Sequence, residues 1–441
     1  MSVALHNARI VTGEGQDYDD GTLTFDGDRI TAVGDGEPSG DTAIDLEGRY
    51  VLPGLIDLHT HMSGGDNGIG HGVEAATFKM DAPLIEAVLD SVEAAGVTLR
   101  AGFTTVREIG TRDYIDVFLR TAQATGQIDA PRILATGPGI SITGGHGEFW
   151  DPTQTVDGVD AFVRRVRQLV HNKVDVIKVV SADGPETVGE WWTVQATAEE
   201  VAAAFAEARR LGRRTATHAM GGEAIVNVVN AGVDTVEHGW YLTEESARLM
   251  AESGTYLVPT LGNVIAIIKH GPALGMPWAE MMADDEEAIF ERMELALGMG
   301  VKIACGSDCG GNEAHIHGRN ADELECYVRF GMSPADAIAA ATIEAARAVR
   351  LDDRVGSLAK GKHADLVILD EDPLSDITAV RTAVVGVIQG GRVVRDDRGL
   401  LGDVAHAPRL VTSKALSPAA AEHESNVRSR ASGSAGVKAP A

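Results

Sequence analysis

Strands and helices alternate eight times along the middle of this chain, which restricts the folds open to it. Eight short apolar segments between residues 53 and 358 are predicted strands: GLIDLH, GFTTVREI, RILATG, VDVIKVV, RTATHA, TVEHG, TYLVPT and KIACGSD. Segments with helical periodicity lie between them, as in DAFVRRVRQLVH and TAEEVAAAFAEARRLG. Eight such units over about 300 residues predict an α/β fold, the (β/α)8 TIM barrel, with its active site at the C-terminal ends of the strands.

The two ends of the chain have a different pattern. ALHNARIV and GTLTFDGDRITAV near the start, and HADLVILD and AVVGVIQ near the end, are short alternating runs typical of a β-meander. Neither set forms a sizeable sheet with a covered face by itself. We therefore expect residues 1–52 and 359–400 to join in one small β-sandwich beside a barrel over residues 53–358. Residues 401–441 are rich in Ala, Ser, Gly and Pro, which predicts a disordered tail.

Charge and composition exclude several classes of partner. The formal net charge is −27, from 38 basic and 65 acidic residues, which argues against nucleic acid and anionic membranes. The N-terminus lacks the pattern of a signal peptide, and no run reaches the length of a membrane helix. Three cysteines are too few for a disulfide framework. These features predict a cytoplasmic enzyme with a small-molecule substrate, with export by an unrecognised signal left open.

Polar residues stand at the ends of five predicted strands. On a strand, side chains at i and i+2 point to the same face, so His59 and His61 project together. Lys178 lies inside the apolar run VIKVV, although lysine is rarely buried unless it is paired or functional. A buried neutral lysine can react with carbon dioxide to give an anionic carbamate that bridges two metals. The predicted site binds two divalent ions, with zinc favoured, through His59, His61, Lys178, His218, His238 and Asp308.

Each of these residues taken singly has an ordinary structural explanation. A lone histidine in a barrel is commonly a core residue with its hydrogen bonds satisfied, and Lys178 can pair with a nearby acid. Six such residues at one end of a predicted barrel favour a metal site.

Between residues 3 and 400 the chain resembles the amidohydrolase superfamily. The resemblance rests on GLIDLHTH, the lysine of VIKVV, THA, VEHG, GSD and GKHADLVILDEDPL. Within it, SITGGHGE and EHGWYLTEE are similar to the Xaa-Pro dipeptidase and imidazolonepropionase-like branch. The resemblance implies that His59, His61 and Asp308 hold the more buried ion, and that His218 and His238 hold the more exposed one. N-carboxylated Lys178 would bridge them, and Asp308 would act first as general base and then as general acid.

The resemblance also indicates residues that contact the substrate. His146 lies in the Gly-rich TGGHG segment, where it is expected to contact a carbonyl or carboxylate of the substrate. Tyr241 follows His238 and is either a phenolic donor for the tetrahedral intermediate or an ordinary loop aromatic.

Other residues near the predicted site carry weaker predictions. Arg107 ends the second strand, where an ion pair within the protein is the favoured role. His315 and His317 are expected to line the pocket, and His71 lies in a segment that could act as a lid. Trp191 and Trp192 form either an apolar wall for a hydrophobic substrate or a packing contact.

The predicted activity is hydrolysis of an amide or peptide C–N bond. The expected substrate resembles a dipeptide or N-acyl amino acid, with xenobiotic amides also open. A cyclic amide, as in imidazolonepropionase, is the alternative substrate, and a non-catalytic barrel acting as an assembly protein is the alternative class. A mononuclear deaminase is disfavoured, because the superfamily's deaminases lack the bridging lysine and carry a glutamate where this chain has Gly221. A homo-oligomer is expected, as is common for barrels of this size.

Overall fold

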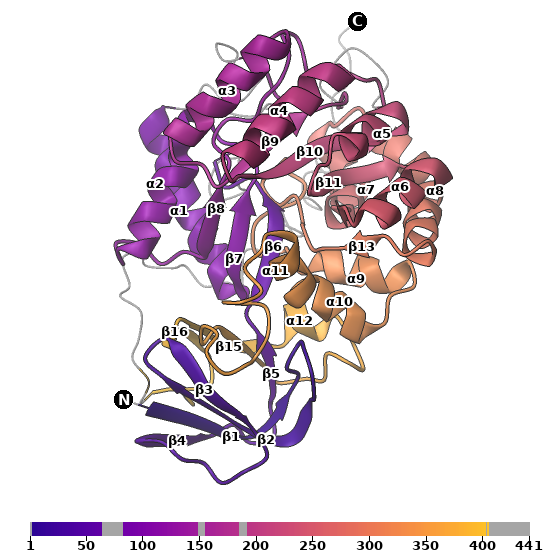
Figure 1. Ribbon diagram of the computed structural model, residues 1–441. Helices are drawn as coiled ribbons and strands as arrows, with labels where there is room; N and C mark the ends of the chain where they lie inside the picture. The colour runs from indigo at the N-terminus through magenta and orange to yellow at the C-terminus, as the bar shows by residue number, and fades with distance from the viewer. Residues whose placement is uncertain (1, 64–82, 149–154, 185–191, 403, 405–441) are drawn as a thin grey trace, which may run out of the picture.

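Both ends of the chain contribute strands to one eight-stranded sheet (Figure 1). The computed structural model describes residues 2–63, 83–148, 155–184, 192–402 and 404. The sheet has the order β16-β15-β14-β5-β1-β2-β3, and β4 pairs with β1. The strands are β1 (Ser2–Ile10), β2 (Tyr18–Asp26), β3 (Arg29–Gly34), β4 (Thr42–Asp45), β5 (Tyr50–Pro53), β14 (Leu366–Leu369), β15 (Val384–Gln389) and β16 (Arg392–Asp396).

The two chain ends meet where β5 pairs with β14. The pairing is antiparallel and places Leu52 opposite Val367, so residues more than 300 positions apart in sequence are neighbours. Buried apolar residues from both ends, including Leu5, Phe25 and Ile368, form a core cluster of their own. The joining of the two ends is thus as the sequence predicts, whereas the packing of this sheet as a sandwich and the domain boundaries stay predictions.

All eight strands expected in the middle of the chain are present and are parallel. A three-stranded sheet has the order β6-β7-β8, and a five-stranded sheet has the order β13-β12-β11-β10-β9. The last strand is shorter than KIACGSD suggests, because only Lys302 and Ile303 pair as a strand. The bounds are β6 (Leu55–Thr60), β7 (Phe103–Glu108), β8 (Arg132–Ala135), β9 (Val176–Val180), β10 (Arg214–Gly221), β11 (Thr235–Tyr241), β12 (Tyr256–Val258) and β13 (Lys302–Ile303).

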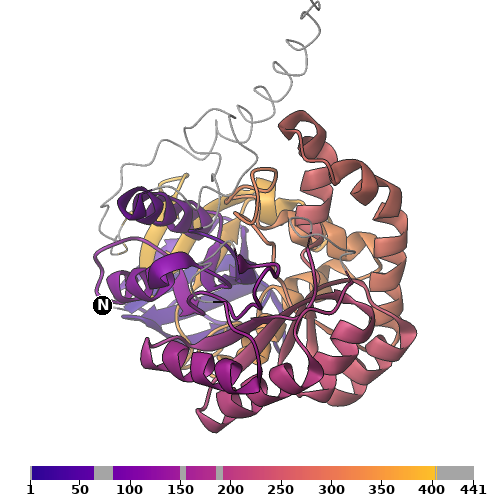
Figure 2. The ribbon, with the colours of Figure 1, turned by 90° about the horizontal axis from the view of Figure 1, so that it is seen from above.

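Backbone hydrogen bonds join the two sheets at both of their edges through the segments that follow β8 and β13. On one side, the Ile140 amide donates to the Lys178 carbonyl at 2.9 Å. On the other side, the Leu58 amide donates to the Cys305 carbonyl at 2.8 Å, and the Asp308 amide donates to the His59 carbonyl at 2.7 Å. Seen from above, helices surround these strands (Figure 2).

The helices pack amphipathic faces against the strands. In α3, for example, Phe162, Val166 and Leu169 are buried at helical spacing. The helices are α1 (Leu84–Arg100), η1 (Arg112–Tyr114), α2 (Ile115–Ala124), α3 (Val159–His171), α4 (Ala198–Arg210), α5 (Gly222–Asn230), α6 (Glu244–Ser253), α7 (Leu261–Leu274), α8 (Ala279–Gly298), α9 (Asp322–Arg329), α10 (Pro334–Ala340), α11 (Ile343–Ala348) and α12 (Ala379–Thr382).

One segment differs from its expected structure. The sequence from Ser333 to Leu351 suggests continuous helix, but α10 and α11 are separated at Thr342, which has φ −134°. The Thr342 hydroxyl donates to the Ile338 carbonyl at 2.7 Å. Side-chain hydrogen bonds of this kind compete with the backbone hydrogen bonds of a helix, which accounts for the break.

Candidate metal centre

Three of the predicted ligands form one tight cluster. His59 is the penultimate residue of β6, His61 comes directly after that strand, and Asp308 lies beyond β13. The Nε2 atoms of the two histidines are 3.3 Å apart, and Asp308 Oδ1 lies 3.5 Å from His59 Nε2 and 3.3 Å from His61 Nε2. Within the described residues, this is the group of three or more His, Cys, Asp or Glu whose ligand atoms lie within 4.8 Å of one another. Two imidazoles and a carboxylate are a donor set that suits zinc.

The backbone around this cluster is fixed by a buried carboxylate. Asp57 accepts hydrogen bonds from the His59 amide at 3.0 Å and from the Ser307 amide at 2.9 Å. The Ser307 hydroxyl and the Asn320 amide group donate to the other oxygen of the same carboxylate, at 2.5 and 2.8 Å. Asp57 therefore ties β6 to the segment that carries Asp308.

His218 and His238 stand beside this cluster. The ring centroids of these two residues are 4.6 Å apart, and that of His238 is 4.8 Å from that of His59. One nitrogen of each ring is engaged, since His218 Nε2 lies 2.9 Å from the Asp183 carbonyl and His238 Nδ1 lies 2.8 Å from Thr260 Oγ1. Hydrogen bonds of this kind orient an imidazole and fix which of its nitrogens faces a metal.

Two of the predicted ligands have a backbone conformation that is costly for their residue types. His238 has φ 69° and Asp308 has φ 58°, both in the left-handed region. Such conformations cost about 1–3 kcal/mol each and persist only where the surrounding structure imposes them. His238 lies within β11 and Asp308 lies beyond the end of β13, so in both residues the strain accompanies the placement of a predicted ligand.

Lys178 is buried in β9, with 1 % of its surface exposed. Burial lowers the pKa of Lys178 to about 8, and Arg107 acts in the same direction while Glu237 and Asp308 oppose it. Its charge acts on His59, His218 and His238, so the amine lies within electrostatic reach of both groups of histidines. A lysine with a lowered pKa has more of the neutral amine that carbamate formation requires.

The histidines are held in the form that binds metals. Burial, which removes the hydration of the charged ring, lowers the pKa of His59, His218 and His238 well below the ordinary value. Neutral imidazole has a free lone pair, whereas the imidazolium ion has none.

Glu237 is a buried residue of this site that the sequence analysis did not single out. It lies 2.9 Å from His59 Nδ1, accepts from Arg107 Nη2 at 2.7 Å, and accepts from the Thr235 hydroxyl at 2.5 Å. The ion pair with Arg107 confirms the role favoured for that arginine. Thr235 and Glu237 are polar at alternate positions of a fully buried stretch of β11 and therefore share a face, and that pattern is the signal that could have revealed them.

The two predicted substrate-contact residues lie in different surroundings. The ring of His146 is 4.4 Å from that of His218, between centroids, so His146 lies beside one of the predicted ligands. The Tyr241 hydroxyl donates to Asp285 of α8 at 2.8 Å, and burial together with that bond raises the pKa of Tyr241 above its ordinary value. Tyr241 also contacts the ring of Trp192, with centroids 5.2 Å apart. The Tyr241 hydroxyl must give up its hydrogen bond to Asp285 before it can donate one to a substrate.

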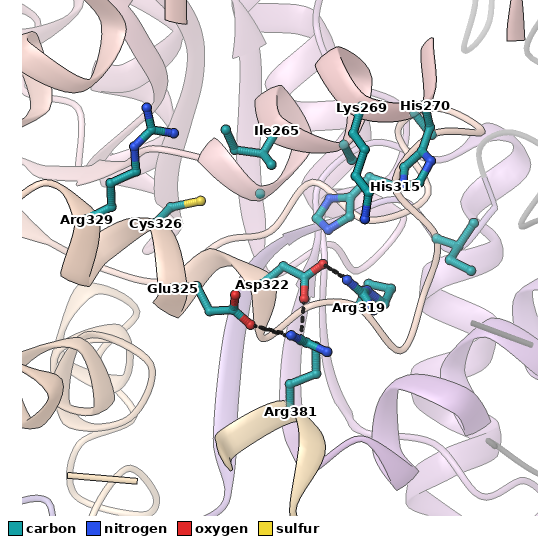
Figure 3. A pocket seen from close by; sticks show the side chains of 14 residues that line it. Ile265, Lys269, His270, His315, Arg319, Asp322, Glu325, Cys326, Arg329 and Arg381 are labelled. Atoms are coloured by element: carbon teal, nitrogen blue, oxygen red, sulfur yellow. Dashed lines mark hydrogen bonds and ion pairs between the residues drawn. The ribbon is translucent and has the colours of Figure 1, made fainter. Parts of the chain in front are cut away.

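The remaining residues highlighted by the sequence have structural contacts. His317 Nδ1 lies 2.9 Å from Thr98 Oγ1, and its Nε2 lies 3.4 Å from the His61 carbonyl. His317 therefore contacts the backbone of His61, one of the predicted ligands. His315 lies beside Cys309 and lines a cavity between α7 and α9 (Figure 3). His71, Trp191 and the tail from 405 onward lie outside the described residues. Among the described helices, none combines the length and the apolar content needed to cross a bilayer.

Comparison with known proteins shows the family. The model of the Amidohydrolase family matches residues 50–394, most of the chain, and the chain therefore belongs to that family. The resemblance inferred from the motifs is thereby confirmed, and the parallel α/β fold agrees with it.

Individual relatives include enzymes with different substrates. The chain is 28% identical over 394 residues to the ochratoxinase of Aspergillus niger, covering 82% of this chain and 79% of that protein. It is 26% identical to the imidazolonepropionase of Paracoccus denitrificans, covering 83% and 93%. Among solved structures, a Xaa-Pro dipeptidase with methionine bound in its active site has a TM-score of 0.81 and 31% identity, covering 90% of this chain and all of that one. These relatives support a hydrolase of amide bonds.

Proposed function

We propose that this protein is a binuclear metal-dependent amidohydrolase that cleaves the C–N bond of a dipeptide or an N-acyl amino acid-like molecule. The observation that carries the proposal is the cluster of His59, His61 and Asp308 with His238 against it, all beside buried Lys178. Neutral imidazoles, a carboxylate and a lysine of lowered pKa are the donors that such a centre requires.

The parallel strands are inferred to close into a (β/α)8 barrel. The backbone hydrogen bonds at both edges of the two parallel sheets support closure, as do the helices around them (Figure 2). In a barrel of this kind, the C-terminal ends of the strands form the active site. His59, His218 and His238 lie at or near the C-terminal ends of β6, β10 and β11, which agrees with that arrangement.

In the proposed site, His59, His61 and Asp308 would hold one ion, and His218 and His238 would hold the other. N-carboxylated Lys178 would supply a ligand to both, and zinc is the favoured metal because the donors are mainly imidazole nitrogen and carboxylate oxygen. When bound, the ions lower the pKa of a water molecule towards neutrality and polarise the carbonyl group of the substrate.

Asp308 is the proposed proton carrier. Its Oδ1 faces His59 and His61, while its Oδ2 accepts a hydrogen bond from Asn263 Nδ2 at 2.6 Å, which fixes the orientation of the carboxylate. From this position Asp308 takes the proton of the attacking water and returns it to the leaving nitrogen. His146, beside His218, binds the carbonyl or carboxylate of the substrate, and Tyr241 donates a hydrogen bond to the substrate once its hydroxyl is released from Asp285.

The relatives support an amide substrate, either linear or cyclic. The Xaa-Pro dipeptidase and ochratoxinase relatives favour a linear amide, in a dipeptide, an N-acyl amino acid or a xenobiotic. The imidazolonepropionase relative, covered over 93% of its length, supports a cyclic amide as the second candidate.

The decisive experiment combines metal analysis with a substrate panel. Purified protein is assayed on dipeptides that include Xaa-Pro, on N-acyl amino acids and on a cyclic amide, before and after removal of metal with a chelator. We expect turnover of a linear amide, its loss on chelation and its return on addition of zinc. Turnover that survives complete metal removal sinks the proposal, and turnover of the cyclic amide alone selects the second candidate.

A further inference from the structure

Three hydrogen bonds in series end at the carboxylate of Asp308. The Ala314 amide donates to Asn312 Oδ1 at 2.9 Å, and Asn312 Nδ2 donates to Asn263 Oδ1 at 2.6 Å. Asn263 Nδ2 in turn donates to Asp308 Oδ2 at 2.6 Å. Asn263 is in the first turn of α7, and Asn312 follows Asp308 in the chain. The carboxamides of Asn263 and Asn312 (the amide pair) therefore join α7 to the segment after Asp308.

The direction of every hydrogen bond in this series is fixed at its two ends. A carboxamide oxygen only accepts, a carboxamide nitrogen only donates, and the two have nearly the same shape. The Ala314 amide can only donate, so it takes the oxygen of Asn312 and leaves the Asn312 nitrogen for Asn263. The ionised Asp308 can only accept, so it takes the nitrogen of Asn263. Turning the Asn263 carboxamide over would place an acceptor against an acceptor on one side and a donor against a donor on the other.

Asn263 and Asp308 are both buried, which gives the direction of these bonds its importance. A hydrogen bond to an ionised group is roughly twice as strong as one between neutral groups. Where water has little access, a carboxamide oxygen turned toward a carboxylate loses that bond and repels the charge. Asp308 is therefore held by the amide pair only while the two carboxamides keep the orientation that the Ala314 amide sets.

The same segment is also fitted to the other oxygen of Asp308. This oxygen, Oδ1, lies 3.5 Å from His59 Nε2 and 3.3 Å from His61 Nε2. A side chain on Gly311 would collide with Asp308 Oδ1. Gly311 is not among the residues with positive φ, so the close approach to Asp308, rather than the backbone conformation, accounts for a glycine here. Both oxygens of the carboxylate are thus constrained by the residues that follow it.

We propose that Asn312 is a positioning residue of the metal centre. By fixing the orientation of the Asn263 carboxamide, it keeps an N–H group on Asp308 Oδ2. This bond holds the plane of the carboxylate, so that Oδ1 stays directed at the ion. Asn263 acts on Asp308 directly, and Asn312 acts through Asn263. The inference rests on the proposed function, since the ion and the proton transfer by Asp308 both belong to it.

The alternative role of Asn312 is local. Its oxygen closes a turn by accepting from the Ala314 amide, and asparagine side chains form such turns in many loops. A purely local role does not depend on Asn263, whereas the proposed role does. A comparison of single and double variants separates the two roles.

The test measures zinc affinity, by competition with a chromophoric chelator, and steady-state kinetics on the preferred amide. Asn312→Asp still accepts from the Ala314 amide but has no N–H group for Asn263, so the Asn263 carboxamide turns over. We expect zinc affinity and kcat each to fall by about tenfold or more, with KM unchanged within about twofold. Asn263→Leu, which removes the carboxamide that contacts Asp308, should have a similar effect.

The double variant decides between the two roles of Asn312. With leucine at position 263 there is no carboxamide to orient, so adding Asn312→Asp should cause no further loss of zinc affinity or kcat. A further loss equal to that in the wild-type background shows a local role and overturns the proposal. Unchanged zinc affinity and kcat in the single Asn312→Asp variant overturn it as well.

A matched control adds the same charge elsewhere. Asn230→Asp, at the exposed end of α5, should leave zinc affinity and kcat unchanged. Thermal unfolding of each variant shows whether it has folded.

Neutron diffraction from deuterium-exchanged crystals of the full chain measures the orientation directly, without metal or turnover. In the wild type we expect the deuterons of the Asn263 nitrogen beside Asp308, and in Asn312→Asp we expect them beside position 312. An Asn263 oxygen that faces Asp308 in the wild type overturns the proposal. A wild type that binds no zinc and hydrolyses no amide overturns the proposed function alone, because the orientation of the amide pair is still measured.

Discussion

The Oε2 atom of Glu237 lies 2.9 Å from Nδ1 of His59, while Nε2 of the same ring faces His61 and Asp308. The imidazole is thus held between a carboxylate on one side and the candidate metal ligands on the other. Arg107, itself buried, holds the far oxygen of Glu237 at 2.7 Å. A carboxylate behind a ligating histidine fixes its tautomer and increases its basicity.

Glu237→Gln is therefore expected to weaken zinc binding. The amide keeps the size of the side chain but removes the negative charge behind His59, and we expect a loss of about 10- to 100-fold in zinc affinity. Competition with a chromophoric chelator measures it. Glu245→Gln, on the exposed start of α6, is the control. An unchanged affinity in Glu237→Gln would show that this carboxylate acts only as a partner for Arg107.

Lys178→Ala tests the bridging role. We expect the metal content to fall from two ions per chain to about one, and turnover to fall by at least about a hundredfold. Adding a short carboxylic acid such as propionate should restore part of both, because its carboxylate can occupy the place of the carbamate. Exposed Lys360→Ala serves as the reference. Retention of two ions by the variant would contradict the bridging carbamate, and a mononuclear enzyme would then have to be considered again.

Asp308→Asn removes the proposed proton carrier while keeping the shape of the side chain. We expect kcat to fall by about 10²- to 10⁴-fold, which is the usual contribution of a general acid–base group. The acid limb of the pH–rate profile should change as well. Asp353→Asn, at an exposed position, should have neither effect. Retention of the wild-type profile would mean that another group carries the proton.

Glu323 provides a test through pH-dependent stability. It is fully buried in α9 and accepts from the Gly262 amide at 2.5 Å, and burial raises its pKa from 4.5 to about 8. Between these two values the folded state keeps a proton that the unfolded state releases, so the free energy of unfolding contributed by Glu323 decreases as pH rises.

Glu323→Gln should remove that decrease. We expect the fall in the free energy of unfolding between about pH 5 and pH 8 to be smaller by about 1–3 kcal/mol in the variant. Urea denaturation at several pH values measures it, with Glu371→Gln at an exposed position as the control. Equal pH dependence in the wild type and Glu323→Gln would show that the carboxyl is ionised when folded.

The parallel strands were predictable because most are short apolar runs with a clear end, as in VIKVV and TYLVPT. The break between α10 and α11 at Thr342 was not predictable, because it depends on one hydroxyl hydrogen bond to Ile338 in a sequence that otherwise favours helix. The cavity beside α7 depends on Lys269 and Arg381, which belong to helices far apart in sequence. No periodicity brings such residues together.

The candidate ligands were marked by polar residues at strand ends, and His59, His61 and Asp308 do lie together. Glu237 was hidden because its partner Arg107 is 130 positions away and only the fold places them in contact. The sequence leaves Tyr241 either a donor to the substrate or an ordinary loop aromatic, and its hydroxyl bonds to Asp285, which the sequence marks only as one acid among several in its helix. Oligomeric state and the carboxylation of Lys178 stay predictions.

The pairing of β5 with β14 has a consequence for the order in which the protein can be completed. β5 leads through Pro53 and Gly54 directly into β6, which carries His59. The strand that pairs with β5 is β14, which begins at Leu366. On the ribosome, chains emerge N-terminus first, so the strand that leads to the two histidines lacks this neighbour until most of the polypeptide has been made. Chain termination before Leu369 would leave every candidate ligand present and the strand that leads to His59 without that support.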